Sequence, residues 1–148
     1  MTEVVLAYAL YQLVYSTLSW PFGALSDRRS RRHVLAGGLV VFALVYLGFA
    51  LAPGGWAVWP LFVVYGVYMA ATDGVGKAWI ADHVRDRAAG TAFGLFAAAT
   101  GAALLVASIV AGLLWSYVGR SAPFLLGAAT AAAALPFVLA LRPARVPA

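Results

Sequence analysis

The sequence contains no cysteine and few charged residues, since only 10% of its 148 positions are Asp, Glu, Lys or Arg. The absence of cysteine excludes disulfide bonds and thiolate metal sites. A soluble chain of this length carries about 25% charged residues. The low charge content and the mean hydropathy of +0.92 therefore exclude a soluble globular domain. The first residues also lack a basic start with a small-residue cleavage site, so we predict no signal peptide.

Apolar runs of about 20 residues take up most of the chain, and each is long enough to cross about 30 Å of hydrocarbon as an α-helix. These runs show no alternating polar positions, which disfavours a membrane β-barrel. We predict an all-α membrane protein, a single domain with five transmembrane helices. The predicted spans cover residues 4–25, 34–52, 58–81, 91–118 and 122–141.

The net charge of +5 lies between the apolar runs, where a membrane surface would be, so it favours a lipid bilayer over nucleic acid as the partner. The connections on one side of the predicted bundle carry the basic residues Arg28, Arg29, Arg31, Arg32, Arg85, Arg87, Arg142 and Arg145. The opposite side carries only Arg120. The positive-inside rule then predicts an outside N-terminus and a cytoplasmic C-terminus in the plasma membrane. The preference for arginine over lysine and the high alanine content favour a bacterial source.

An acid–amine pair lies inside the third predicted span. Asp73 precedes Lys77 by four residues, which places both side chains on one helical face and suits an ion pair. Counted from Asp82, Asp73 lies about 13 Å deep, close to the bilayer midplane. A charge at that depth costs about 2.5–3.5 kcal/mol and usually has a partner and a function. A structural alternative is that Lys77 extends to the cytoplasmic surface while it neutralises Asp73.

A polar stripe marks one face of the first predicted span. Its members are spaced by three and four residues and comprise Tyr8, Gln12, Tyr15, Ser16 and Ser19. A glutamine facing lipid would leave its amide without hydrogen bonds, so the stripe should line a watery cavity or a helix interface. Hydrogen bonding between helices is the structural alternative.

The fourth predicted span carries small residues at roughly helical spacing, a pattern that lets two helices approach closely. They are Gly90, Gly94, Ala97, Gly101, Ser108 and Gly112. Catalytic signals are absent from the sequence: His33 and His83 stand singly at span ends, without a nucleophile or a ligand cluster. There is no phosphate-binding glycine loop. We therefore predict that the chain is not an enzyme and binds no metal or cofactor.

The charged block after the first span reads Gly23-Ala-Leu-Ser-Asp27-Arg28-Arg29-Ser-Arg31-Arg32. Asp27 lies at a helix C-terminus, where the dipole disfavours a carboxylate, so it should need an external partner. An orientation signal alone explains the arginines but not Asp27 or Gly23. The block resembles the signature loop of the major facilitator superfamily of secondary transporters, Gly-x-Leu-x-Asp-Arg-x-Gly-Arg-Arg/Lys. It departs from that pattern at Ser30.

The resemblance implies part of a transporter that moves a small solute by alternating access of two halves. The five spans look like helices eight to twelve of such a protein, so the N-terminal half would be an absent partner. By carry-over, Gly23, Asp27, Arg28, Arg31 and Arg32 would form a conformational latch. Asp73 and Lys77 would serve substrate binding or coupling, and Tyr8, Gln12 and Tyr15 would face the central cavity. A non-transporting scaffold that binds a partner helix bundle is the alternative.

Overall fold

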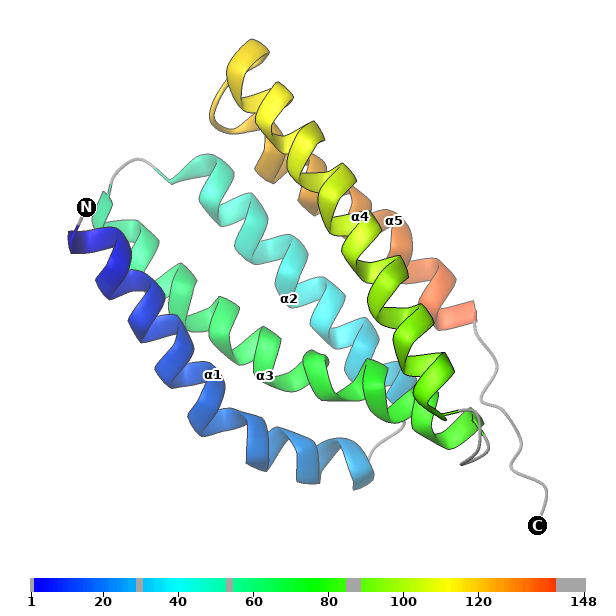
Figure 1. Cartoon of the computed structure of the whole chain (residues 1–148). Coiled ribbons are helices and arrows are strands. Elements are labelled where there is room, and N and C mark those ends of the chain that lie inside the picture. The colour runs from blue at the N-terminus through cyan, green and yellow to red at the C-terminus, as the bar shows by residue number, and fades with distance from the viewer. Residues whose placement is uncertain (1, 29–30, 53–54, 85–88, 141–148) are drawn as a thin grey trace.

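The computed structural model describes residues 2–28, 31–52, 55–84 and 89–140, and this part of the chain is helical without any strand (Figure 1). Its elements are α1 (Thr2–Arg28), α2 (Arg31–Leu51), the short 3-10 turn η1 (Gly55–Ala57), α3 (Val58–His83), α4 (Ala89–Tyr117) and α5 (Ala122–Ala140). The predicted all-α class is confirmed. The assignment of the whole chain to a single domain stays a prediction.

Four helical segments in the described part of the chain are long and apolar enough to cross a membrane. They are Arg32–Leu51, Gly55–Val75, Ala89–Tyr117 and Ala122–Ala140. Helix α1 is also long, with 27 residues, and it contains Pro21. The tyrosines, the glutamine and the serines of its polar stripe lower its hydropathy below that of the other helices.

The helices extend beyond the apolar runs at the charged block. We expected Arg28, Arg31 and Arg32 in a loop, but α1 continues to Arg28 and α2 begins at Arg31. That expectation was wrong because an apolar run marks where the hydrocarbon ends, whereas a helical backbone can continue through arginine, a good helix former. Only residues 29 and 30 separate the two helices, and they lie outside the described residues.

The helices pack in the spatial order α1, α3, α2, α5 and α4, which differs from their order in the sequence. Helix α3 lies between α1 and α2, and α5 covers the other side of α2 (Figure 1). A small core forms along these contacts, with Val45 on α2 and Val75 on α3 almost completely buried. Most other side chains face outward, as expected of a bundle whose apolar surface contacts lipid.

Glycines mark the close contacts between the packed helices. A Cβ atom at Gly66 of α3 would lie 3.1 Å from the carbonyl oxygen of Tyr11 and from Val14, both on α1. One at Gly127 of α5 would lie 2.5 Å from the Tyr46 ring on α2. Small residues therefore set the distance between these membrane helices, as they do in other membrane bundles.

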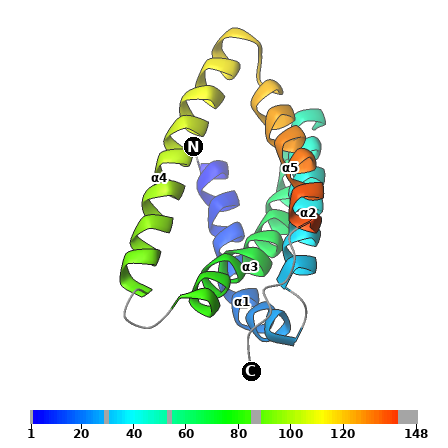
Figure 2. The same ribbon diagram turned by 90° about the vertical axis from the view of Figure 1, so that its right-hand side faces the viewer.

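Helix α4 stands apart from the rest of the bundle. Figure 2 shows it on the far side from α2, with α5 as its main neighbour. None of its residues is buried, and a Cβ at Gly90, Gly94, Gly101 or Gly112 would meet nothing within 4 Å. The close approach that we expected at this small-residue face does not occur among the described residues. The turn from α4 to α5 uses Gly119, whose φ of +139° favours glycine.

Candidate functional site

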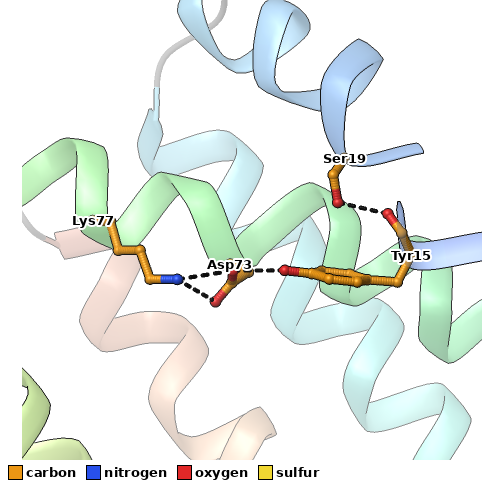
Figure 3. A network of polar contacts seen from close by, with 4 residues as sticks. All are labelled: Tyr15, Ser19, Asp73 and Lys77. Atoms are coloured by element: carbon orange, nitrogen blue, oxygen red, sulfur yellow. Dashed lines mark hydrogen bonds and ion pairs between the residues drawn. The ribbon is translucent and has the colours of Figure 1, made fainter. Parts of the chain in front are cut away.

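The acid–amine pair predicted in the third span is present on α3. Lys77 Nζ lies 3.0 Å from Asp73 Oδ2 and 3.3 Å from Oδ1, so the ammonium group bridges both carboxylate oxygens (Figure 3). The Asp73 side chain is 35% exposed and the Lys77 side chain 57% exposed. The predicted ion pair is confirmed, and both partners are accessible at the surface of this bundle.

Tyr15 joins this pair from the neighbouring helix. Its phenol donates a hydrogen bond of 2.9 Å to Asp73 Oδ2, which connects α1 with α3 (Figure 3). The hydroxyl of Ser19 in turn donates to the backbone carbonyl of Tyr15. The structure thus brings together three residues that the sequence assigned to two separate spans. The Asp73 carboxylate accepts from two different donors and is well supplied with hydrogen bonds.

Packing of α1 on α3 positions this network. Gly66 gives α1 room to lie against α3, and Tyr15 follows Tyr11 by one helical turn, so its phenol reaches Asp73 about two turns along α3 from Gly66. Val75 is 1% exposed and faces the bundle interior, while Asp73 and Lys77 lie on a more open side of the same helix. The charged groups therefore avoid the apolar core.

The polar stripe of α1 continues from this network as a row of tyrosines. The ring centroids of Tyr8 and Tyr11 lie 5.7 Å apart, and those of Tyr11 and Tyr15 lie 6.1 Å apart with nearly parallel planes. Tyr8 is 59% exposed, and Gln12 is also exposed. Among the described residues, none forms a hydrogen bond with the side chain of Tyr8, Tyr11 or Gln12.

Tyr11 was missed in the sequence, although its spacing from Tyr8 and Tyr15 could have indicated it. Its ring centroid lies 5.4 Å from that of Tyr65 on α3, so it anchors the row to the neighbouring helix. The serines of the stripe behave differently from the tyrosines. Ser16 donates to the carbonyl of Leu13 within its own helix, and Ser19 to that of Tyr15. These serines therefore do not connect helices within the described part.

The latch residues are described only in part. The side chains of Asp27, Arg28 and Arg31 lie outside the described residues. Gly23 is exposed, and a Cβ there would meet nothing within 4 Å. Arg32 donates from Nη1 to the carbonyl oxygen of Leu139 at 3.3 Å, near the C-terminal end of α5. A cation is favourable at that end of a helix, so Arg32 ties α2 to α5 within this chain.

A concave feature lies at the end of the bundle opposite the Asp73–Lys77 pair, next to the turn between α4 and α5. It is a cavity of about 700 Å³ between α2, α3, α4 and α5, and it was not predicted from the sequence. Aromatic rings from different helices form its wall, including Tyr46, Tyr65, Trp115 and Phe124. Arg120 is the charged residue in its lining.

The family model described as Major Facilitator Superfamily matches residues 1–148. An uncharacterised MFS-type transporter of Methanocaldococcus jannaschii is 41% identical over 108 residues, which cover 73% of this chain and 27% of that protein. No solved structure matches the chain.

Two further relatives are tetracycline resistance proteins. The class C protein of Escherichia coli is 34% identical over 120 residues, or 81% of this chain and 30% of the relative. The class G protein of Vibrio anguillarum is 33% identical over 121 residues, which cover 82% of this chain and 30% of that protein. The matches thus span less than a third of the length of each of these relatives.

Proposed function

Because this chain belongs to the Major Facilitator Superfamily, a family of membrane transporters, we propose that it forms part of a secondary transporter for a small solute. The relatives point to a transporter rather than an enzyme. The single observation that carries the proposal is the cluster of Tyr15, Asp73 and Lys77, which joins α1 to α3 and remains accessible at the surface of this bundle. A charged pair in this position would be expensive against lipid, so it should face a water-filled cavity or a substrate path.

In this proposal α1 and α3 provide one wall of the transport path. Asp73 and Lys77 contact the substrate or carry the coupling charge, and Tyr15 holds the carboxylate in place. Tyr8 and Gln12 extend the same wall, because their polar groups have no hydrogen-bond partner among the described residues and would be costly against hydrocarbon. A carboxylate near the midplane can also take up a proton, so Asp73 is our candidate for proton coupling.

The remainder of the transporter would cover α4. Its small-residue face has no close neighbour in the described chain, whereas Gly66 of α3 and Gly127 of α5 lie at helix contacts. Helix α4 therefore resembles one side of a helix interface whose other side is absent. We propose that helices equivalent to an N-terminal half, together with one helix preceding α1 in the same half, pack against this face and against the aromatic cavity.

The charged block would act as a latch between the halves. We propose that Asp27 engages the second half, together with Gly23 and Arg28 in the last part of α1 and Arg31 at the start of α2. Arg32 would anchor this region through its contact with the end of α5. In this arrangement the block lies on the cytoplasmic side, in agreement with the distribution of arginines in the sequence.

Transport in proteoliposomes tests the proposal. The complete protein that carries this chain should accumulate a solute when a proton or ion gradient is imposed, and Asp73→Asn should abolish the response to a proton gradient. Unchanged pH-driven uptake in Asp73→Asn would remove the coupling role from Asp73. A scaffold, favoured only by the uncovered face of α4, would show no gradient-driven uptake and would tolerate alanine at Asp73 and Lys77.

A further inference from the structure

The chemistry of the open face of α1 and α3 indicates which kind of molecule could bind there. Tyr8, Tyr11 and Tyr15 form a row of rings that spans about 10 Å along α1, at 1.5 Å per residue. The row ends at the ion pair of Asp73 and Lys77, to which Tyr15 is bonded. The face thus combines an apolar aromatic stretch with one charged end.

The charged end retains unused donor capacity on Lys77. Asp73 already accepts hydrogen bonds from Tyr15 and from Lys77 on its two oxygens. Lys77 has three N–H donors, and its described contacts go to Asp73 alone. Lys77 is also the more exposed partner, 57% against 35%. Lys77 therefore keeps N–H donors that could bind an acidic oxygen of a ligand.

We infer that this face, made of Tyr8, Tyr11, Tyr15 and Lys77, binds a planar aromatic anion. The tyrosine rings offer faces and edges for a flat ring system, and aromatic contacts add to the burial of apolar area. Lys77 would donate a charge-assisted hydrogen bond to the carboxylate or an equivalent acidic oxygen of the ligand. Apart from Lys77, the described residues of this face offer the Gln12 amide and two phenols as polar groups, so the face suits a mostly apolar ring better than a polyhydroxyl compound.

This inference rests on the proposed transport function, because it places the ligand in the proposed transport path. It is tested by equilibrium binding, which does not require transport. We would titrate the purified complete protein in detergent with three probes by calorimetry. The probes are 2-naphthoate, its cationic counterpart 2-naphthylmethylammonium, and cyclohexanecarboxylate, which has the charge without the aromatic ring.

We expect 2-naphthoate to bind at least about tenfold more tightly than either of the other probes. Lys77→Met should weaken naphthoate binding by about tenfold to a hundredfold, the range for a hydrogen bond to a charged group. The double variant Asp73→Asn/Lys77→Met removes both charges, so it leaves no unpaired carboxylate, and it should lose as much naphthoate affinity as Lys77→Met. Arg120→Gln, at the opposite end of the bundle, should bind as the unmodified protein does. Tyr8→Leu should weaken binding by about threefold to tenfold.

Binding at Lys77 can also be measured in the unmodified protein, by chemical labelling of its amine. Bound naphthoate should protect its amine from acylation by an acetyl N-hydroxysuccinimide ester, as measured by mass spectrometry of the peptide that contains it. Equal affinity for the anionic and cationic probes, or unchanged naphthoate binding in both Lys77 variants, would overturn the inference. If other solutes are transported but naphthoate does not bind, the inference fails and the transport proposal stands. If naphthoate binds as expected but no gradient moves any solute, the transport proposal fails alone.

Discussion

The phenol of Tyr15 donates a 2.9 Å hydrogen bond to the carboxylate of Asp73, although the two residues are 58 positions apart in the sequence. This bond connects α1 with α3 at the same carboxylate that pairs with Lys77. The carboxylate is thereby held from two helices at once. Any movement of α1 relative to α3 must either preserve this bond or release a polar group inside the membrane, which is unfavourable.

Removal of the phenol hydroxyl should affect function more than stability. Tyr15→Phe keeps the ring that stacks on Tyr11 but loses the bond to Asp73. Hydrogen bonds between membrane helices contribute about 0.6 kcal/mol on average, so the free energy of unfolding should fall by less than about 2 kcal/mol. The transport rate should fall by about tenfold, because Asp73 loses its positioning partner. Tyr117→Phe on the exposed end of α4 is the matched control and should change neither quantity. A rate equal to that of the unmodified protein would contradict the positioning role.

Removal of one charge of the ion pair should destabilise the protein more than removal of both charges. Lys77→Met leaves the Asp73 carboxylate without its counter-charge, and an unpaired acid in a membrane helix costs at most about 2.5–3.5 kcal/mol on insertion scales. Asp73→Asn/Lys77→Met should recover most of that loss in unfolding measurements with denaturing detergent. Transport should remain absent in both variants, since both lack the charged groups. If the double variant transports normally, the pair serves only the structure.

The two parts of this site differ in how well the sequence predicted them. The ion pair follows from a spacing of four residues within one helix, which fixes the geometry locally. The contact of Tyr15 with Asp73 depends on how far α1 is shifted along α3, and close packing at Gly66 sets that register. Nothing in the local sequence around either residue encodes that shift. The role of Tyr11 in joining the tyrosine row to α3 was missed for the same reason.

The same distinction applies to the fold. Hydropathy predicted the helices because the length of an apolar run reflects the thickness of the membrane. It ended the first span too early, at residue 25 instead of Arg28, and began the second too late, at residue 34 instead of Arg31, because charged residues can continue a helix beyond the hydrocarbon. The small residues of α4 predicted close packing, but in the described chain this face meets no partner within reach. A small-residue pattern indicates that a helix packs closely against another, but it does not identify which helix is the partner.

Glycine substitutions should separate contacts inside this chain from contacts with the rest of the protein. Gly66→Leu introduces a side chain where even a Cβ would lie 3.1 Å from Tyr11 and Val14. It should destabilise the α1–α3 pair by about 1–3 kcal/mol, as overpacking of a close contact does. Gly101→Leu on α4 has open space in the described chain. It should leave these five helices unaffected when they are expressed alone and should weaken their association with the remaining helices. Unfolding measurements on the five helices alone, and co-purification with the remaining helices, would test both variants. Equal destabilisation of the isolated helices by Gly66→Leu and Gly101→Leu would contradict the prediction.

The orientation can be tested directly because the chain contains no cysteine. Ser30→Cys would place a thiol in the charged block, and Ser121→Cys would place one in the turn just before α5, at the opposite end of the bundle. The excess of arginine around Ser30 predicts that this side faces the cytoplasm. A membrane-impermeant maleimide applied to intact cells should therefore label Ser121→Cys but not Ser30→Cys. Permeabilised cells should show labelling of both, which controls for thiol reactivity. The reverse pattern would place the charged block outside the cell, where a cytoplasmic latch could not operate.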